Sequence, residues 1–130
     1  MSSLPQKKQI LIVDDNQDIR LLLAQVLEEE DTYTIWLAKN GVEAIAQATQ
    51  VHPDLILLDM SLPGMSGWEV VTHLRSLADL AQTPIIAVTA SVSLLDQERA
   101  LTLGCTKHLG KPFDLTTLLE TVASLLEQRV

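Results

Sequence analysis

A short run of aliphatic residues in the middle of the chain ends on a carboxylate, Leu55-Ile56-Leu57-Leu58-Asp59. The four aliphatic residues show no polar alternation, which is typical of a strand covered on both faces, as in a parallel sheet flanked by helices. Pro63 and Gly64 follow as turn residues. Because open α/β sheets bind ligands at the carboxyl ends of their strands, the position of Asp59 predicts a functional site. Taken alone, Asp59 also fits a turn-initiating or helix-capping role.

Similar strand patterns recur along the chain. The expected strands span residues 9–13, 32–38, 55–59, 85–88 and 106–109. Each is followed by a helical pattern that begins after an N-capping residue: Asn16, Asn40, Ser66, Ser93 or Asp114. These helices are expected to end near residues 27, 49, 74, 103 and 126. Five alternations over short links predict a parallel sheet with helices on both faces, because right-handed crossovers are strongly favoured.

The composition excludes several classes of protein. A chain of 130 residues has room for one domain, and its net charge of −8 argues against binding to nucleic acid or to an anionic membrane. The single cysteine, Cys105, cannot form an intramolecular disulfide and has no zinc-ligand spacing around it. The sequence has neither the apolar segment of a secretory signal nor an apolar run of membrane-spanning length. We therefore expect a cytoplasmic protein with no membrane partner.

Polar residues follow the carboxyl ends of four expected strands: Asp14 and Asp15, Asp59, Thr89, and Lys111. In a parallel sheet these ends share one edge, so we expect the side chains to converge. Two carboxylates about 4 Å apart repel by roughly 4 kcal/mol at an effective dielectric constant near 20, so three of them need a counter-charge. Mg²⁺ binds carboxylate, water and phosphate oxygens and would supply it, with Lys111 as a second positive charge. Individually, Thr89 also fits a β-branched strand end, and Lys111 fits a solvated turn charge that pairs with a nearby acid.

Four segments resemble the receiver domain of two-component response regulators, in particular single-domain, chemotaxis-regulator-like members. They are Val13-Asp14-Asp15, Leu58-Asp59-Met60-Ser61-Leu62-Pro63-Gly64, Val88-Thr89-Ala90 and Lys111-Pro112-Phe113. No single segment is specific, but the four together, in the family's order and at strand ends, are specific, and the resemblance covers nearly the whole chain. It implies a doubly wound five-stranded parallel sheet of flavodoxin-like strand order 2-1-3-4-5 with five flanking helices. The receiver domain is expected at 9–130, after a flexible N-terminal arm at 1–8.

By this resemblance, Asp59 accepts a phosphoryl group from a phosphohistidine on a sensor histidine kinase or a histidine phosphotransfer protein. The implied cofactor is Mg²⁺, or Mn²⁺ in its place. Asp15 would bind the metal directly and Asp14 through water; the other implied metal ligands are Asp59 and the backbone carbonyl of Ser61. The implied contacts of the phosphoryl oxygens are the Thr89 hydroxyl, the Ala90 backbone N–H and the Lys111 amine. The Lys111-Pro112 bond is expected to be cis.

The resemblance also suggests switch and docking residues. In the family, an aromatic residue three positions before the lysine follows the threonine inward after phosphorylation; here that position holds His108, which we interpret as an atypical switch residue or a merely exposed histidine. The start of the first helix docks the phosphodonor in the family, which implicates Asn16, Gln17, Asp18, Ile19 and Leu22. Core packing is the alternative for Ile19 and Leu22. Leu21 lies off the apolar stripe of this helix, and some of the apolar residues of the helix are expected to stay exposed.

The expected function is that of a stand-alone receiver that signals through phosphorylation-dependent binding to a downstream protein. It would not be an enzyme with a separate turnover substrate. A receiver-like module that binds partners without phosphorylation, and a receiver fragment of a larger regulator or hybrid kinase, remain as alternatives. An acid-nucleophile phosphatase is disfavoured because those enzymes resemble Asp-x-Asp and the chain has no cap segment.

Overall fold

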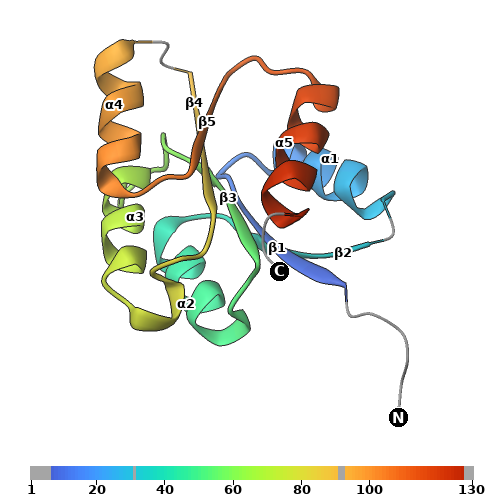
Figure 1. The fold of residues 1–130 in the computed structure, drawn as a ribbon, viewed down its shortest axis with the longest axis horizontal. Coiled ribbons are helices and arrows are strands. Elements are labelled where there is room, and N and C mark those ends of the chain that lie inside the picture. Colours follow the sequence, from blue (N-terminus) through green and yellow to red (C-terminus); the bar gives the residue numbers. More distant parts are fainter. Residues whose placement is uncertain (1–6, 31, 91–92, 128–130) are drawn as a thin grey trace.

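The computed structural model describes residues 7–30, 32–90 and 93–127. The elements, in chain order, are β1 (Lys8–Val13), α1 (Gln17–Glu28), β2 (Tyr33–Ala38), α2 (Gly41–Val51), β3 (Leu55–Asp59), α3 (Gly67–Arg75), the 3₁₀ turn η1 (Ala78–Leu80), β4 (Ile85–Thr89), α4 (Leu94–Leu103), β5 (Lys107–Gly110) and α5 (Leu115–Glu127). Within the described residues the strands form one parallel five-stranded sheet of order β2-β1-β3-β4-β5 (Figure 1). The predicted doubly wound fold is confirmed.

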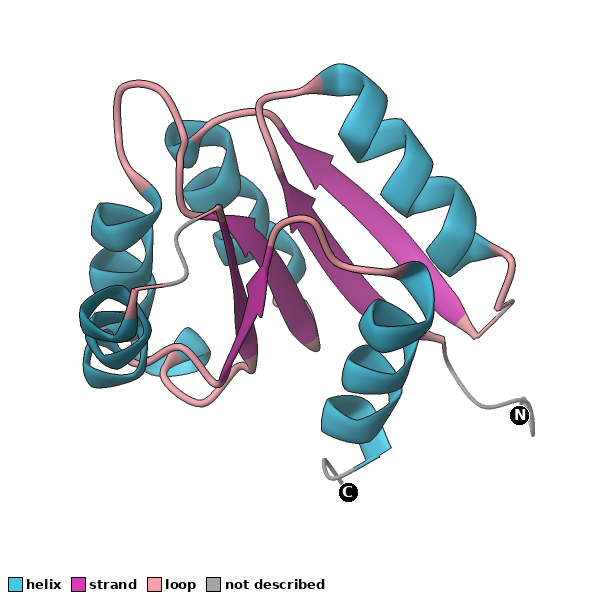
Figure 2. Cartoon of the chain, turned by 90° about the horizontal axis from the view of Figure 1, so that it is seen from above, coloured by secondary structure: helices cyan, strands magenta, loops and turns pink. Residues whose placement is uncertain are grey.

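Helices cover both faces of the sheet (Figure 2). Alternate strand residues such as Ile10 and Ile12 pack against α1 and α5, while Leu11 and Val13 belong to the core beneath α2, α3 and α4. The strand period of two therefore divides the apolar residues between two cores. β3 and β4 are buried throughout and β1 is buried from Ile10 onward, which explains their continuous aliphatic runs without polar alternation.

The five predicted N-caps all form. In each, the side-chain oxygen accepts a hydrogen bond from the backbone N–H three residues later, at Ile19, Glu43, Glu69, Asp96 and Thr117. These bonds satisfy amide groups that the first turn of a helix leaves without a partner. Because each cap is a local interaction, the sequence predicts the residue at which each helix begins.

Other boundaries differ from the predictions. Lys8, predicted to lie in the arm, is the first residue of β1, because its N–H donates to the carbonyl of Thr32 at 3.0 Å. β4 extends to Thr89, β5 is shifted by one residue toward the C-terminus, and α2 extends to Val51. Strand ends are set by pairing with neighbours, which a local pattern does not contain. Residues 1–6 of the predicted arm lie outside the described residues.

The amphipathic pattern of α1 is also corrected. The buried residues of this helix are Leu23, Ala24 and Leu27, whereas Leu22, predicted to lie on the apolar stripe, is 50% exposed. Its neighbour Leu21 is 52% exposed, as expected. No helix in the described part of the chain is long and apolar enough to cross a membrane.

Candidate functional site

Three carboxylates gather at the carboxyl edge of the sheet. Asp14 directly follows β1 and Asp59 ends β3, and both are buried, whereas Asp15 is exposed. One oxygen from each of the three lies within 4.8 Å of the other two. Side chains two positions apart in a strand lie on the same face of the sheet. Asp14 is two positions after Ile12, and Asp59 is two positions after Leu57. Both acids therefore belong to the face covered by α1 and α5. The predicted convergence of the acids is therefore confirmed.

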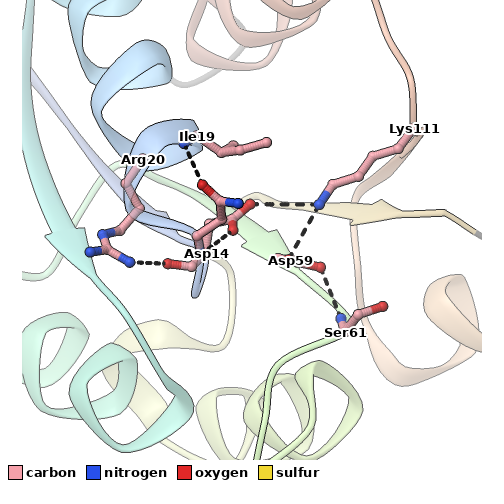
Figure 3. A network of polar contacts seen from close by, with 7 residues as sticks. Asp14, Ile19, Arg20, Asp59, Ser61 and Lys111 are labelled. Atoms are coloured by element: carbon pink, nitrogen blue, oxygen red, sulfur yellow. Dashed lines mark hydrogen bonds and ion pairs between the residues drawn. The ribbon is translucent and has the colours of Figure 1, made fainter.

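Backbone amides hold the two buried carboxylates in place. The N–H of Asn16 donates to Oδ1 of Asp14, and the N–H of Ser61 donates to Oδ1 of Asp59, both at 2.9 Å (Figure 3). Each acid thus has one oxygen fixed by the loop that follows it. The second oxygen, Oδ2 in both residues, is left to face the centre of the site.

Lys111 lies between these two free oxygens. Its Nζ is 3.3 Å from Oδ2 of Asp59 and 3.6 Å from Oδ2 of Asp14 (Figure 3). Its backbone N–H donates to the carbonyl of Thr89 at 2.8 Å, which ties the loop after β5 to the end of β4. The Lys111-Pro112 peptide is cis, as predicted. Lys111 is consequently part of the acidic cluster and pairs with two of its acids.

The electrostatics of the cluster favour a cation. Burial raises the pKa of Asp14, and the charges of Asp59 and Asp15 raise it further, while the Asn16 N–H and the Lys111 amine oppose the change. Three carboxylates face one ammonium group, so the site keeps negative charge that Lys111 does not neutralise. An all-oxygen donor set with this excess charge fits Mg²⁺ better than zinc, which prefers nitrogen and sulfur ligands.

The remaining predicted site residues lie at the carboxyl ends of β3 and β4. Thr89, the last residue of β4, is buried, and Ala90 and Ser61 lie exposed in the loops after β4 and β3. The β3–α3 loop that carries Ser61 is packed tightly at Gly67, where a Cβ atom would lie 2.5 Å from the Cα of Met60. Gly67 therefore lets the start of α3 approach the end of β3 closely.

His108 is not merely exposed. It lies in β5 and is partly buried, and its Nε2 atom is buried with no hydrogen-bond partner among the described residues. It lines a hollow of about 350 Å³ with Lys107 and with residues of α5, including Thr117 and Glu120. The simple alternative of an exposed histidine is wrong, and the role of His108 as a switch residue stays a prediction.

The predicted docking residues form the exposed start of α1. Asn16, Gln17, Asp18 and Leu22 are exposed, while Ile19 is partly buried. Core packing does not explain Leu22, since half of this side chain is accessible. Ile19 and Leu22 both line a cavity of about 370 Å³ that reaches Asp14, Asp59 and Lys111.

Arg20 is a site residue that the sequence patterns missed. Its Nη1 donates to the backbone carbonyl of Asp14 at 2.7 Å and so connects the first turn of α1 to the acidic loop (Figure 3). In the sequence, the signal for this contact is a cationic residue six positions after Asp14. That spacing is not specific without the fold, because a bond to a carbonyl leaves no pattern of residue types.

Comparisons with known proteins agree with this geometry. Residues 10–123 match the family model of the response regulator receiver domain. The polar-differentiation response regulator DivK of Brucella ovis is 38% identical over 119 residues, which cover 92% of this chain and 96% of DivK. The chemotaxis response regulator CheY4 of Vibrio cholerae superposes with a TM-score of 0.87 at 32% identity, covering 92% of this chain and 99% of that one. A CheY-like receiver domain protein of Methanospirillum hungatei gives 0.87 at 31% identity, covering 95% and 96%.

Proposed function

Because the chain belongs to the response regulator receiver domain family, we propose that Asp59 is its phosphoacceptor. Receiver domains are signalling domains of two-component systems that are phosphorylated by histidine kinases or phosphotransfer proteins. The observation that carries the proposal is the arrangement of Asp59, with Oδ1 fixed by the Ser61 N–H and Oδ2 beside Lys111. The nucleophilic oxygen is thus oriented, and a positive charge lies where phosphoryl oxygens would arrive.

The transfer follows from this orientation. Oδ2 of Asp59 attacks the phosphorus of a phosphohistidine, the P–N bond breaks, and its electron pair returns to the imidazole. An aspartyl phosphate forms. Lys111 would contact the phosphoryl oxygens, as would the Thr89 hydroxyl and the Ala90 backbone N–H. Phosphoryl transfer depends mainly on positioning and on neutralising oxygen charge, which these groups would provide.

Mg²⁺, or Mn²⁺ in its place, fits the acidic cluster. We assign it to Asp14, Asp15, Asp59 and the backbone carbonyl of Ser61, and when bound it supplies positive charge to the phosphoryl oxygens. Without it, the carboxylates would repel the incoming phosphoryl group. The protein's own part is to hold these oxygens together, through the Asn16 and Ser61 amides and the contact of Arg20 with Asp14.

Signalling would proceed through binding and not through turnover of a separate substrate. Phosphorylation adds about −1.5 to −2 charges, to which Thr89 and His108 would respond by changing the surface beside β5. The start of α1 would dock the phosphodonor protein through the exposed residues Asn16, Gln17, Asp18 and Leu22 and the partly buried Ile19. We assign the receiver unit to the chain from β1 onward. A cytoplasmic location and a stand-alone mode of action stay predictions.

Intact mass spectrometry tests the proposal. With Mg²⁺ and acetyl phosphate, the wild-type protein should gain one phosphoryl group, and neither the Asp59→Asn variant nor the wild type in EDTA should gain it. Lack of an adduct with acetyl phosphate and with histidine kinases would contradict the proposal. It would favour the second candidate, a module that binds partners without phosphorylation, for which the unusual His108 is the supporting observation.

A further inference from the structure

The cavity beside Asp59 combines two acids and a lysine with an apolar wall. It has a volume of about 370 Å³ and lies between α1, the loop after β5 and the sheet. Asp14, Asp59 and Lys111 form one part of its lining. Nearly all the rest is aliphatic or aromatic, including Ile19, Leu22, Phe113 and Leu115.

The apolar wall opens to solvent. Leu22 and Leu115, which face this cavity from α1 and α5, are 50% and 38% exposed. Covering apolar surface of this kind is favourable, at roughly 25 cal/mol per Å² in general. A ligand with an apolar part would therefore gain affinity by entering the cavity, provided that its polar end suits the groups around Asp59.

The volume of the cavity and the charges that line it restrict which ligands it can bind. An engineered protein cavity of about 150 Å³ accommodates benzene, so the cavity beside Asp59 has room for a group of about six carbons. With Mg²⁺ present, Lys111 and the metal charge would favour an anionic head such as a phosphoryl group at Asp59. The apolar part of such a molecule would then extend along Leu22 and Leu115.

We propose that the cavity binds the carbon chain of an acyl phosphate, so that medium-chain acyl phosphates are direct phosphoryl donors to Asp59. This inference rests on the proposed function. In the transfer, Oδ2 of Asp59 forms a bond to phosphorus, and the bond between phosphorus and the acyl oxygen breaks. The electron pair stays on that oxygen, so the products are aspartyl phosphate and a fatty acid carboxylate.

The test compares hexanoyl phosphate with acetyl phosphate as donors at equal, subsaturating concentration in Mg²⁺, with phosphorylation followed by intact mass. Each methylene removed from water strengthens binding by roughly fourfold. Because the cavity is partly open, we expect the rate constant with hexanoyl phosphate to exceed that with acetyl phosphate by about tenfold or more. Hexylphosphonate, which cannot transfer its phosphorus group, should raise the melting temperature of the protein more than methylphosphonate does.

Matched leucine variants locate the effect. Leu22→Asn and Leu115→Asn should both bring the ratio of the two rate constants toward one. Leu21→Asn is the control, because Leu21 is the adjacent residue, is equally exposed at 52%, and is not among the described residues that line the cavity. This variant should keep the wild-type ratio.

The outcomes separate this inference from the proposed function. A ratio near one in the wild type, with a normal adduct from acetyl phosphate, would overturn the inference and leave the phosphoacceptor role intact. The cavity would then be open to an apolar side chain of a docked protein. A high ratio that Leu22→Asn and Leu115→Asn do not reduce would also overturn it. No adduct from either acyl phosphate would overturn the inference, and it would contradict the phosphoacceptor role as well only if histidine kinases also gave no adduct.

Discussion

Asp14 shows how a single residue can be placed for binding at a cost in stability. Its carboxyl is buried beside two other acids, and burial raises its pKa. Because its pKa is raised, Asp14 stabilises the folded state when it is protonated. This stabilisation is complete when the pH lies below the pKa that the carboxyl has in the unfolded chain. It is lost as the pH rises through the pKa of the folded state. At neutral pH the ionised Asp14 therefore lowers the free energy of unfolding.

The Asp14→Asn variant should accordingly be more stable than the wild type in EDTA at pH 7, by more than the roughly 0.5 kcal/mol within which surface substitutions usually fall. The amide oxygen can still accept the Asn16 N–H, so the loop should keep its conformation. Urea unfolding curves would measure the difference. Glu98→Gln, a neutralisation at an exposed position of α4, is the control and should change stability by less than about 0.5 kcal/mol. A less stable Asp14→Asn variant would contradict this account.

Cys105 lies away from the acidic cluster and provides a second test of how stability depends on pH. Burial raises the pKa of its thiol to about 11, while the charge of Arg75 acts in the opposite direction. The protonated Cys105 thiol contributes its full stability below the ordinary thiol pKa. This contribution is lost as the pH rises toward 11. We expect unfolding free energy to fall more between pH 9 and pH 11 in the wild type than in Cys105→Ala. Equal slopes in the two proteins would argue against a buried, protonated thiol.

At the scale of elements, Arg75 joins the end of α3 to two neighbouring segments. Its Nη1 donates to the carbonyl of Leu80 at 2.7 Å, and its Nε and Nη2 donate to the carbonyl of Gly104 at 3.0 and 2.7 Å. Gly104 ends α4 with a φ of 111°, where a Cβ atom would lie 3.0 Å from the Arg75 side chain. The guanidinium group thus fixes where α4 ends relative to α3.

Replacing Arg75 by methionine keeps most of the apolar stem but removes the three donors. We expect a loss of about 2–3 kcal/mol in unfolding free energy, because partly buried carbonyls lose their partners. Arg75→Lys should recover only part of this, since an ammonium group cannot reproduce the forked geometry. Chemical denaturation of the three proteins would measure both effects. Full recovery by lysine would show that charge alone matters at this position.

At the scale of the whole molecule, the acidic edge should couple metal binding to folding. A ligand that binds only the folded state adds stability by mass action, about 2.7 kcal/mol at 100 times its dissociation constant. Saturating Mg²⁺ should therefore raise the melting temperature by several degrees relative to KCl of equal ionic strength. Asp15→Asn should reduce the gain, although Asp15 is exposed. An identical melting temperature in both salts would exclude metal binding at the cluster.

Much of the fold could be predicted from short stretches of the sequence. Continuous aliphatic runs such as Leu55–Leu58 predicted buried parallel strands, and capping residues such as Ser66 and Asp114 predicted where helices begin. Both signals depend on residues close together in the chain, so they survive without knowledge of the fold. The alternation of strands and helices then implied that Asp14 and Asp59 meet at one edge.

How the convergent residues contact one another depends on the folded chain. Lys111 contacts Asp59 across 52 positions of sequence, at a distance set by strand register and by the bond of its amide to Thr89. The exposure of Leu22, the buried Nε2 of His108 and the cavity beside Asp59 likewise depend on how α1 and α5 pack against the sheet. The helices and strands and their order follow from the amino-acid sequence, because periodicity and capping are local. Packing and register decided which side chains touch, because those contacts join segments that are distant in the chain.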